Sequence, residues 1–322
     1  MKISQLFIAV FATLSVSAQA ASSINLGSYS VSGTYDLDLA VGSVSGLEAS
    51  AVTYVRDRGT LFFVGDEGTG VIETSLTGQT LGSMTFNWAG TGSTNNDAEG
   101  LTYIGGGNLV LTEERLYDAY SFSYMAGGSV NLANNYVSIS NATVGNNGLE
   151  GISYDPRDGS FVTVKQQSPQ DILSGSLTFA GGAGGTSTLT NLFNPSLLGV
   201  SSLSDIQTLS PVDSLIGTTA ADNLLILSLG SNRLLEVNRT GSILSSLDLS
   251  SFLPRNNFEG VTVDQNGTIY LVAEQDQLSG APFGAKSRLV VLTAPVPEPQ
   301  TYAMLLAGLG FVGFASRRQK RS

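Results

Sequence analysis

An acid followed by glycine recurs at the head of short segments in which apolar and polar residues alternate, and this repeat limits the folds open to the chain. In the clearest copy, Glu99-Gly100 opens one such segment, three glycines follow at 105–107, and a second segment runs through 108–114. Alternation with a period of two is typical of strands, so each copy predicts a β-hairpin with the acid at its open end.

Five copies of this hairpin are readable. The position that glycine holds in the clearest copy is occupied in turn by Ala51, Gly100, Gly151, Asp205 and Gly260. The intervals between these positions are 49, 51, 54 and 55 residues. Such a period, in a unit that contains only strands, is typical of a β-propeller blade. The repeat therefore predicts an all-β fold, a five-bladed β-propeller, with six blades as the alternative.

The two ends of the propeller are predicted to meet. Four strands fit into each interval, but after the last copy there is room for three, of which the final one spans 288–293. The segment 29–39 precedes the first copy and has the pattern of a strand pair without a hairpin of its own. We expect this N-terminal segment to complete the last blade, because joining the two ends closes the ring and removes a free sheet edge.

The first residues have the pattern of a secretory signal peptide. Lys2 precedes an apolar run at 6–16, and Ala18-Gln19-Ala20 has the small-x-small pattern of a cleavage site. We expect residues 1–20 to be removed and residues 21–294 to form the propeller as one domain. The glycine-rich stretch 181–185 lies inside the third repeat, where it is interpreted as a loop between strands and not as a linker.

The last residues, 295–322, contain Pro297-Glu298-Pro299, an apolar run at 302–315 and a basic tail at 317–321. These three parts, in this order, resemble the PEP-CTERM sorting signal of exopolysaccharide-producing bacteria. The resemblance implies processing by an exosortase-type membrane protease and export across the inner membrane, to the cell surface or as a secreted protein. A plain C-terminal anchor is the alternative. The apolar run of 14 residues is shorter than the about 20 that span a bilayer, so we expect transient membrane anchoring only.

Composition excludes several classes of function. The chain contains no cysteine and no histidine. Disulfides, thiolate or histidine metal sites, and catalytic systems that depend on histidine are therefore excluded. Setting aside Lys2, the four basic residues of the tail and Glu298 leaves 10 basic and 25 acidic residues, a net charge of −15. Such a charge repels nucleic acid, so no nucleic-acid partner is expected.

The repeated acids are expected to meet at one mouth of the central channel. The first strand of a blade is the innermost, so its start lies at one mouth, and the antiparallel second strand ends at the same mouth. The predicted metal-ligating residues at these strand ends are Glu99, Glu150, Asp205, Glu259, Glu113, Glu274 and Asp66. In the fourth copy Ser204 is an alternative to Asp205, and the first copy offers Ser50.

A cation would explain so many carboxylates near one axis, because they repel one another unless a positive charge compensates. Calcium (Ca²⁺) fits best, since it takes about 6–8 oxygen ligands in loose geometry. The alternative is that each acid accepts hydrogen bonds from backbone N–H groups of the next blade and only braces the ring.

Several of these motifs occur in an order that resembles the SdiA-regulated (YjiK-like) family. They are 97–103 with 111–117, 148–151 with 164–165, 203–205 with 227–228, and 258–261. The resemblance covers about residues 45–293 and implies a five-bladed propeller distantly similar to NHL-repeat proteins, with bound calcium and no established enzymatic activity. This chain has Lys165-Gln166-Gln167 where the family usually reads Lys-Glu, so one carboxylate of the family pattern is absent.

The preferred functional interpretation is an exported, calcium-binding, non-catalytic propeller that acts as a surface or extracellular-matrix binding protein for a polysaccharide or another protein. A metal-dependent hydrolase resembling esterase-like phytase propellers is the alternative, and a purely structural matrix protein is a third. No catalytic residues are predicted. Trp88 and the tyrosines 117, 120 and 124 offer flat faces for sugar rings, but blade cores also use aromatic residues in this way.

Overall fold

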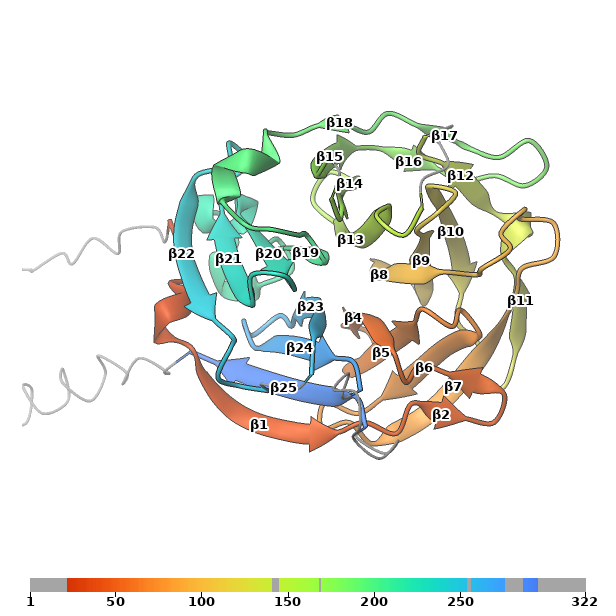
Figure 1. The fold of residues 1–322 in the computed structure, drawn as a ribbon, viewed down its shortest axis with the longest axis horizontal. Helices are drawn as coiled ribbons and strands as arrows, with labels where there is room; N and C mark the ends of the chain where they lie inside the picture. Colours follow the sequence, from red (N-terminus) through yellow and green to blue (C-terminus); the bar gives the residue numbers. More distant parts are fainter. Residues whose placement is uncertain (1–21, 141–144, 168, 254–255, 276–285, 295–322) are drawn as a thin grey trace, which may run out of the picture.

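Five sheets stand around a central axis (Figure 1) in the computed structural model, which describes residues 22–140, 145–167, 169–253, 256–275 and 286–294. The regular elements in these ranges are β-strands and short 3₁₀ helices. The predicted all-β, five-bladed β-propeller is confirmed, and the six-blade alternative is wrong.

The blades follow the sequence repeat, and each has four antiparallel strands from the axis outward. Blade 1 contains β4 (Ala49–Val55), β5 (Thr60–Gly65), β6 (Gly70–Thr74) and β7 (Thr80–Asn87). Blade 2 contains β8 (Ala98–Gly105), β9 (Asn108–Glu113), β10 (Asp118–Ser123) and β12 (Tyr136–Ser138). Blade 3 contains β13 (Leu149–Asp155), β14 (Ser160–Lys165), β15 (Asp171–Gly175) and β18 (Thr190–Asn191). Blade 4 contains β19 (Asp205–Thr208), β20 (Leu224–Ser228), β21 (Arg233–Val237) and β22 (Ile243–Asp248). Blade 5 contains β23 (Phe258–Val263), β24 (Ile269–Ala273), β25 (Arg288–Thr293) and β1 (Ser30–Asp36).

Short elements decorate the loops. A parallel strand, β11 (Ser129–Asn131), extends blade 1 beyond β7. Two small hairpins are formed by β2 (Ala40–Val41) with β3 (Val44–Ser45) and by β16 (Leu177–Thr178) with β17 (Thr186–Ser187). The 3₁₀ helices are η1 (Leu26–Ser28), η2 (Leu132–Asn134), η3 (Pro195–Leu198), η4 (Asp213–Leu215) and η5 (Thr219–Asp222). The glycine-rich stretch 181–185 therefore connects a hairpin within the third repeat and is not a linker.

The N-terminal segment completes blade 5 as predicted. Strand β1 pairs antiparallel with β25, from Ser30 opposite Thr293 to Asp36 opposite Arg288, and the two strands lie side by side in Figure 1. The predicted strand pair at 29–39 is wrong in one respect, because the segment forms a single strand. Strand β1 ends at Asp36, although the N–H of Leu37 still donates to the carbonyl oxygen of Ser287 over 2.8 Å, and the Leu37 side chain is fully buried.

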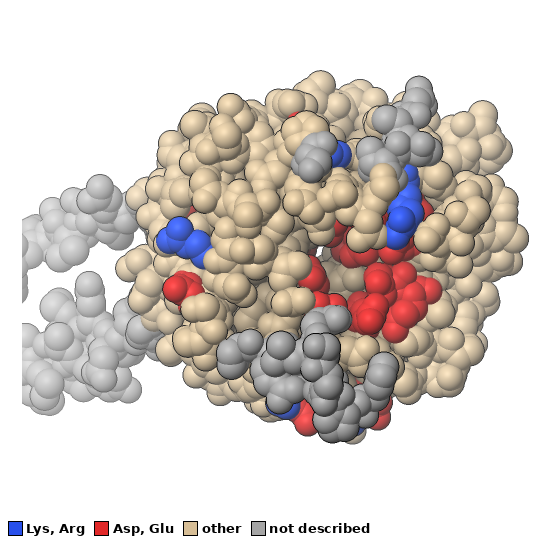
Figure 2. Space-filling view, viewed as in Figure 1, with Lys and Arg blue, Asp and Glu red and all other residues tan. Residues whose placement is uncertain are grey.

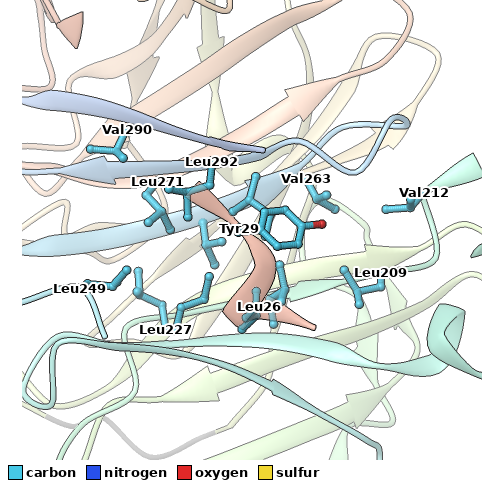
Figure 3. Packing of buried hydrophobic residues seen from close by; sticks show 14 of the residues in the cluster. Leu26, Tyr29, Leu209, Val212, Leu227, Leu249, Val263, Leu271, Val290 and Leu292 are labelled. Carbon is cyan, nitrogen blue, oxygen red and sulfur yellow. The ribbon is translucent and has the colours of Figure 1, made fainter. Parts of the chain in front are cut away.

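The N-terminal segment also fills the seam between blades 4 and 5. Figure 3 shows Leu26 and Tyr29 packed among side chains of both blades, including Leu227 and Leu292. The Tyr29 hydroxyl donates to the carbonyl oxygen of Gly267 in the β23–β24 turn, over 3.0 Å. Burial of this apolar surface stabilises the closed ring by about 25 cal/mol per Å².

A buried carboxylate holds the start of this segment. Glu236 on β21 is fully buried and accepts hydrogen bonds from Ser23 Oγ over 2.6 Å and from Ile24 N over 2.9 Å. Asn223 Nδ2 and Ser245 Oγ also donate to it, over 2.8 and 2.7 Å. The residues that follow the predicted cleavage site are thus tied to blade 4.

Of the aromatic residues named above as sugar-stacking candidates, Tyr117 and Tyr120 are buried, whereas Trp88 and Tyr124 are partly buried and pack against the core. Tyr120 is fully buried, and Trp88 packs edge-on against it with ring centroids 5.4 Å apart. Tyr120 belongs to the apolar cluster between blades 1 and 2, and Trp88 packs against that cluster.

Within the described ranges no helix has the length and apolar character to cross a membrane. The predicted signal peptide, 1–20, and the sorting segment, 295–322, lie outside the described residues.

Candidate metal centre at one mouth of the channel

Four of the five inner strands begin with a β-bulge. Their ladders shift register at Ser50, Glu99, Glu259 and, in blade 3, at the pair Glu150-Gly151. A bulge leaves a residue without a partner in the ladder and re-aims its side chain. The acids of blades 2, 3 and 5 therefore stand at positions where the backbone turns a side chain out of the regular alternation.

The glycine after the acid is required by the close approach of neighbouring blades. A Cβ atom at Gly100 would lie 2.5 Å from the carbonyl oxygen of Glu150 on blade 3. A Cβ atom at Gly151 would lie 2.5 Å from the Cα atom of Asp205 on blade 4. At Gly260 it would lie 3.0 Å from the Cα atom of Ala51 on blade 1. The acid-glycine pair thus combines a bulge with a backbone contact between blades.

Side chains two residues after the glycine position brace the ring. Backbone N–H groups of the next blade donate to the hydroxyls of Thr53, Thr102 and Ser153 over 3.0–3.1 Å. The Thr262 hydroxyl accepts from the N–H of Tyr54 and donates to the side-chain carbonyl of Gln207, which closes the circle. The bracing considered above for the glutamates is therefore carried largely by these residues.

An acidic cavity of about 220 Å³ lies at the mouth where the inner strands begin. Seven carboxylates line it: Glu48, Asp66, Glu99, Glu114, Glu150, Glu259 and Glu274. Ser50, Asn146 and Gln166 add neutral oxygen atoms, and no Lys or Arg of the described chain lines it. Figure 2 shows acidic residues gathered around the hollow at the centre of this face. The structure thus brings together five of the predicted acids, those at positions 66, 99, 150, 259 and 274.

Three acids approach one another most closely. One carboxylate oxygen from each of Asp66, Asp97 and Glu99 lies within 4.8 Å of the other two. Calcium–oxygen distances are about 2.3–2.6 Å, so two ligands on opposite sides of an ion stand about 5 Å apart. The spacing therefore fits a shared calcium ion. Asp97 also accepts a hydrogen bond from Arg115 Nε.

Burial and mutual repulsion favour the protonated forms of these acids. Burial, together with repulsion from Glu48, raises the pKa of Asp66 to about 7. Burial, together with repulsion from Glu274, raises the pKa of Glu259 to about 8. Burial also raises the pKa values of Glu99 and Glu150 well above the ordinary value, and repulsion from neighbouring acids adds to the rise.

Glu114 also has a raised pKa, and one of its oxygens is buried without a hydrogen-bond partner among the described residues. Its pKa is raised to about 7, chiefly by burial, although the N–H of Gly148 donates to one oxygen over 3.0 Å. Its Oε2 atom is buried and has no hydrogen-bond partner among the described residues. A buried carboxylate oxygen without a partner is costly unless a cation neutralises it.

Asp205 lies outside the acidic cavity. The ladder between β19 and β20 is regular, from Asp205 opposite Leu227 to Thr208 opposite Leu224. Both oxygens of Asp205 accept backbone N–H groups over 2.7 Å, one from Ile206 and one from Val261 on blade 5. Burial raises the pKa of Asp205, and these two hydrogen bonds oppose the rise. The alternative interpretation of the acids as braces therefore describes the contacts of Asp205.

Glu113 also points away from the cavity. It accepts from Ser93 Oγ over 2.7 Å and from the N–H of Leu116 over 2.6 Å. Its neighbour Glu114 lines the cavity instead, because successive side chains at a strand end point in opposite directions. Glu114 and Glu48 were not predicted to line the cavity, and Asp97 was given no ligand role. Asp97 had a signal, because it lies two residues before Glu99 in the clearest copy.

The departure from the family pattern at 165–167 adds no cation to the cavity. Lys165 Nζ donates to the carbonyl oxygens of Gln167 and Pro169, over 2.7 and 2.8 Å. Gln166 lines the cavity and offers a neutral amide there.

Comparison with known families agrees with the fold and with the order of the motifs. The SdiA-regulated family matches residues 29–277, which is more than half of the chain. The chain belongs to the SdiA-regulated family. A PEP-CTERM protein-sorting motif matches residues 295–321. That motif implies processing by an exosortase-type enzyme and points to export toward the cell surface.

Solved structures resemble this SdiA-regulated protein over most of its length. Glutaminyl cyclase from Myxococcus xanthus superposes with a TM-score of 0.51 at 14% identity, covering 82% of this chain and 95% of its own. A luciferin-regenerating enzyme superposes with a TM-score of 0.48 at 10% identity, covering 82% and 95% respectively. At 14% identity the likeness to the glutaminyl cyclase concerns the fold alone.

Proposed function

We propose that this SdiA-regulated protein is an exported, non-catalytic propeller that holds calcium in the acidic cavity and acts as a binding protein at the cell surface or in the extracellular matrix. One observation carries the calcium site: seven carboxylates line one cavity, and no basic side chain of the described chain does. One carboxylate oxygen from each of Asp66, Asp97 and Glu99 lies within 4.8 Å of the other two, and Asp66 and Glu99 line the cavity together with Glu150 and Glu259.

The donor set favours calcium over other metals. Carboxylates, amide carbonyls and a hydroxyl are hard oxygen donors, and neither histidine nor cysteine is present to select a softer metal. Magnesium demands near-octahedral geometry and keeps several waters, whereas calcium accepts more ligands in loose geometry. Ligands drawn from blades 1, 2, 3 and 5 would join those blades at the axis.

A hydrolase of anionic phosphate esters fits this cavity poorly. Such substrates need positive side chains beside the metal. Arg115, which stands nearby, is engaged by Asp97 and Asn146. The binding role is therefore the better supported of the two.

Metal analysis of the purified mature protein tests the calcium site. After equilibration with calcium and magnesium together and removal of free metal, we expect about one calcium per chain. The melting temperature should rise with added calcium and fall with chelator. At a free calcium concentration a hundred times Kd, we expect the free energy of unfolding to increase by roughly 2.7 kcal/mol. A protein that carries no calcium and melts alike in calcium and chelator would contradict the proposal.

Export is tested separately. Replacing Pro297-Glu298-Pro299 by alanines should leave the protein unprocessed and retained in the cell envelope, as followed by immunoblot of cell and medium fractions. Unchanged release of the alanine variant would remove the role of the sorting motif while leaving the calcium site untouched.

A further inference from the structure

A second cavity, of about 290 Å³, lies at the opposite ends of the same inner strands. Three of its tyrosines each follow the acid position of their strand by four residues, or about 13 Å along a strand. Tyr54, Tyr103 and Tyr154, from blades 1, 2 and 3, form part of its wall. Thr53 and Thr102 from the bracing ring are among its lining residues. We call it the tyrosine cavity.

The aromatic walls are held in place before any ligand arrives. The Tyr54 ring lies parallel to that of Tyr270, with centroids 6.5 Å apart. The Tyr103 hydroxyl donates to Asp57 and accepts the N–H of Gly107. The Tyr154 ring packs on Phe161 at 5.1 Å. Rings fixed in this way lose little conformational entropy when a ligand binds.

Some buried polar atoms that line this cavity can form further hydrogen bonds. Thr53 and Thr102 are 4% and 5% exposed, and each hydroxyl accepts a backbone N–H of the next blade. No acceptor in the described chain is recorded for their own protons. The Oε1 atom of Gln265 is buried and has no partner among the described residues. Two donors and one acceptor therefore border the cavity, and leaving such groups unpaired is unfavourable.

The charges at the rim are already paired. Arg56 donates two hydrogen bonds to Asp213, over 2.8 and 2.9 Å. Asp57 is bound by Tyr103, as described above. The cavity thus presents aromatic faces and neutral polar groups, so a neutral ligand fits it better than an ion.

We infer that the tyrosine cavity binds an uncharged pyranose sugar. A sugar ring carries hydroxyls that both donate and accept around its edge, which matches the threonine donors and the Gln265 acceptor, and its C–H faces pack on tyrosine rings. A planar aromatic compound fits less well, because polar groups do not surround its ring as hydroxyls surround a sugar ring. The volume of about 290 Å³ is just below the usual range for ligand pockets, about 300–1,000 Å³, and suits one ring. This inference rests on the binding role proposed above and names a ligand class for it.

Titration of the mature, calcium-loaded protein with single sugars tests the inference. The probes are D-glucose, D-galactose, D-mannose and N-acetyl-D-glucosamine, with indole as the arene control, followed by saturation-transfer NMR and calorimetry. We expect at least one sugar to bind. Tyr154→Ala should weaken it by about tenfold or more, through loss of one wall, and Gln265→Met by about tenfold, through loss of the acceptor. Tyr35→Ala, on the outer strand β1, should leave the affinity unchanged.

Two results would overturn the inference. One is that no sugar binds to the folded protein, or that indole alone binds. The other is equal sugar affinity in wild type, Tyr154→Ala and Gln265→Met. Calcium titration of the same samples separates this outcome from the proposed function, because a failed sugar site with intact calcium binding leaves the calcium proposal standing.

Discussion

Blades 3 and 4 both begin with an acid at the same mouth, yet the two acids make different contacts. In blade 3 Glu150 stands at a β-bulge, before the glycine, and lines the acidic cavity. In blade 4 Asp205 stands at the position of that glycine, on a regular ladder, and accepts the N–H of Val261 on blade 5. The positions of the two acids in the repeat thus differ by one residue. This difference decides whether the carboxylate faces the channel or joins two blades.

Acidic residues therefore serve two purposes in one repeat, since some line the channel and one joins two blades. Successive side chains of a strand point to opposite sides, so a shift of one position changes the neighbour that a carboxylate meets. At blade 4 the position of the channel acid is taken by Ser204, whose side chain hydrogen-bonds Glu259. The joint between blades 4 and 5 therefore uses an acid and the N-terminal segment, whereas the acids of blades 2, 3 and 5 remain available for a cation.

Deleting residues 22–36 should have the largest effect, because this segment serves blade 4 and blade 5 together. The deletion exposes the edge of β25, removes Leu26 and Tyr29 from the seam and takes two donors from Glu236. We expect aggregation or loss of cooperative unfolding, measured by size-exclusion chromatography and circular dichroism. A monomer with unchanged melting would show that the seam does not depend on the segment.

Asp205→Ala should be the most damaging single substitution of the comparison. It leaves the buried N–H groups of Ile206 and Val261 without their acceptor, and each orphaned donor costs about 1–3 kcal/mol, so we expect a loss of roughly 2–6 kcal/mol. Chemical denaturation measures this loss. Asp205→Asn, which keeps one oxygen acceptor, should lose less. A change below about 0.5 kcal/mol in both variants would remove the bracing role.

Gly151→Ala tests the backbone contact between the same two blades. A Cβ atom there would meet Asp205 Oδ1 at 1.9 Å, so we expect a loss of about 1–3 kcal/mol from overpacking. Gly145→Ala is the matched control, because no heavy atom of the described residues, apart from its chain neighbours, lies within 4 Å of its Cβ position. Equal stability of the two variants in denaturant titrations would show that the blades do not need the close approach.

The stability of the calcium-free protein should depend on pH in a distinctive way, with a smaller effect than the substitutions above. Folded pKa values of about 7 for Asp66 and Glu114 and about 8 for Glu259 lie above those of unfolded chains, so the folded state retains protons that the unfolded state has released. This contribution is complete below the ordinary carboxyl pKa and is lost as pH rises through 7 to 8, with a slope of up to about 1.4 kcal/mol per pH unit for each retained proton.

Thermal unfolding in chelator, from about pH 5 to about pH 8.5, measures this slope. The melting temperature should fall as pH rises, and calcium should flatten the fall because it favours the ionised acids. Stability that rises with pH in chelator would mean that the channel acids are ionised and paired in another way.

The repeat made the fold predictable, but the course of individual strands was harder to derive. The spacing of the acid-glycine pairs identified the blades, and the missing fourth strand of the last unit identified the closure. The end of β1 at Asp36 was not predicted, since Leu37 and Leu39 alternate like a strand while their side chains fill the core beside blade 1.

The site was predictable to within one residue at each strand end. Glu99, Glu150 and Glu259 follow directly from the pattern, because a glycine marks the bulge beside each of them. Asp205 and Glu113 do not, since the choice between neighbouring side chains depends on register, which hydrophobic alternation alone leaves open at a strand end. Glu48 carries no acid-glycine signal at all.

Calcium calorimetry on wild type, Glu150→Gln and Asp205→Asn tests the central claim most directly, with melting of the calcium-free forms measured beside it. We predict that Glu150→Gln binds calcium at least about tenfold more weakly and, without calcium, melts no lower than wild type, because repulsion among the channel acids is relieved. Asp205→Asn should keep the calcium affinity of wild type and melt lower. The account is contradicted if wild type binds no calcium, or if Glu150→Gln lowers the calcium-free stability while leaving calcium affinity unchanged.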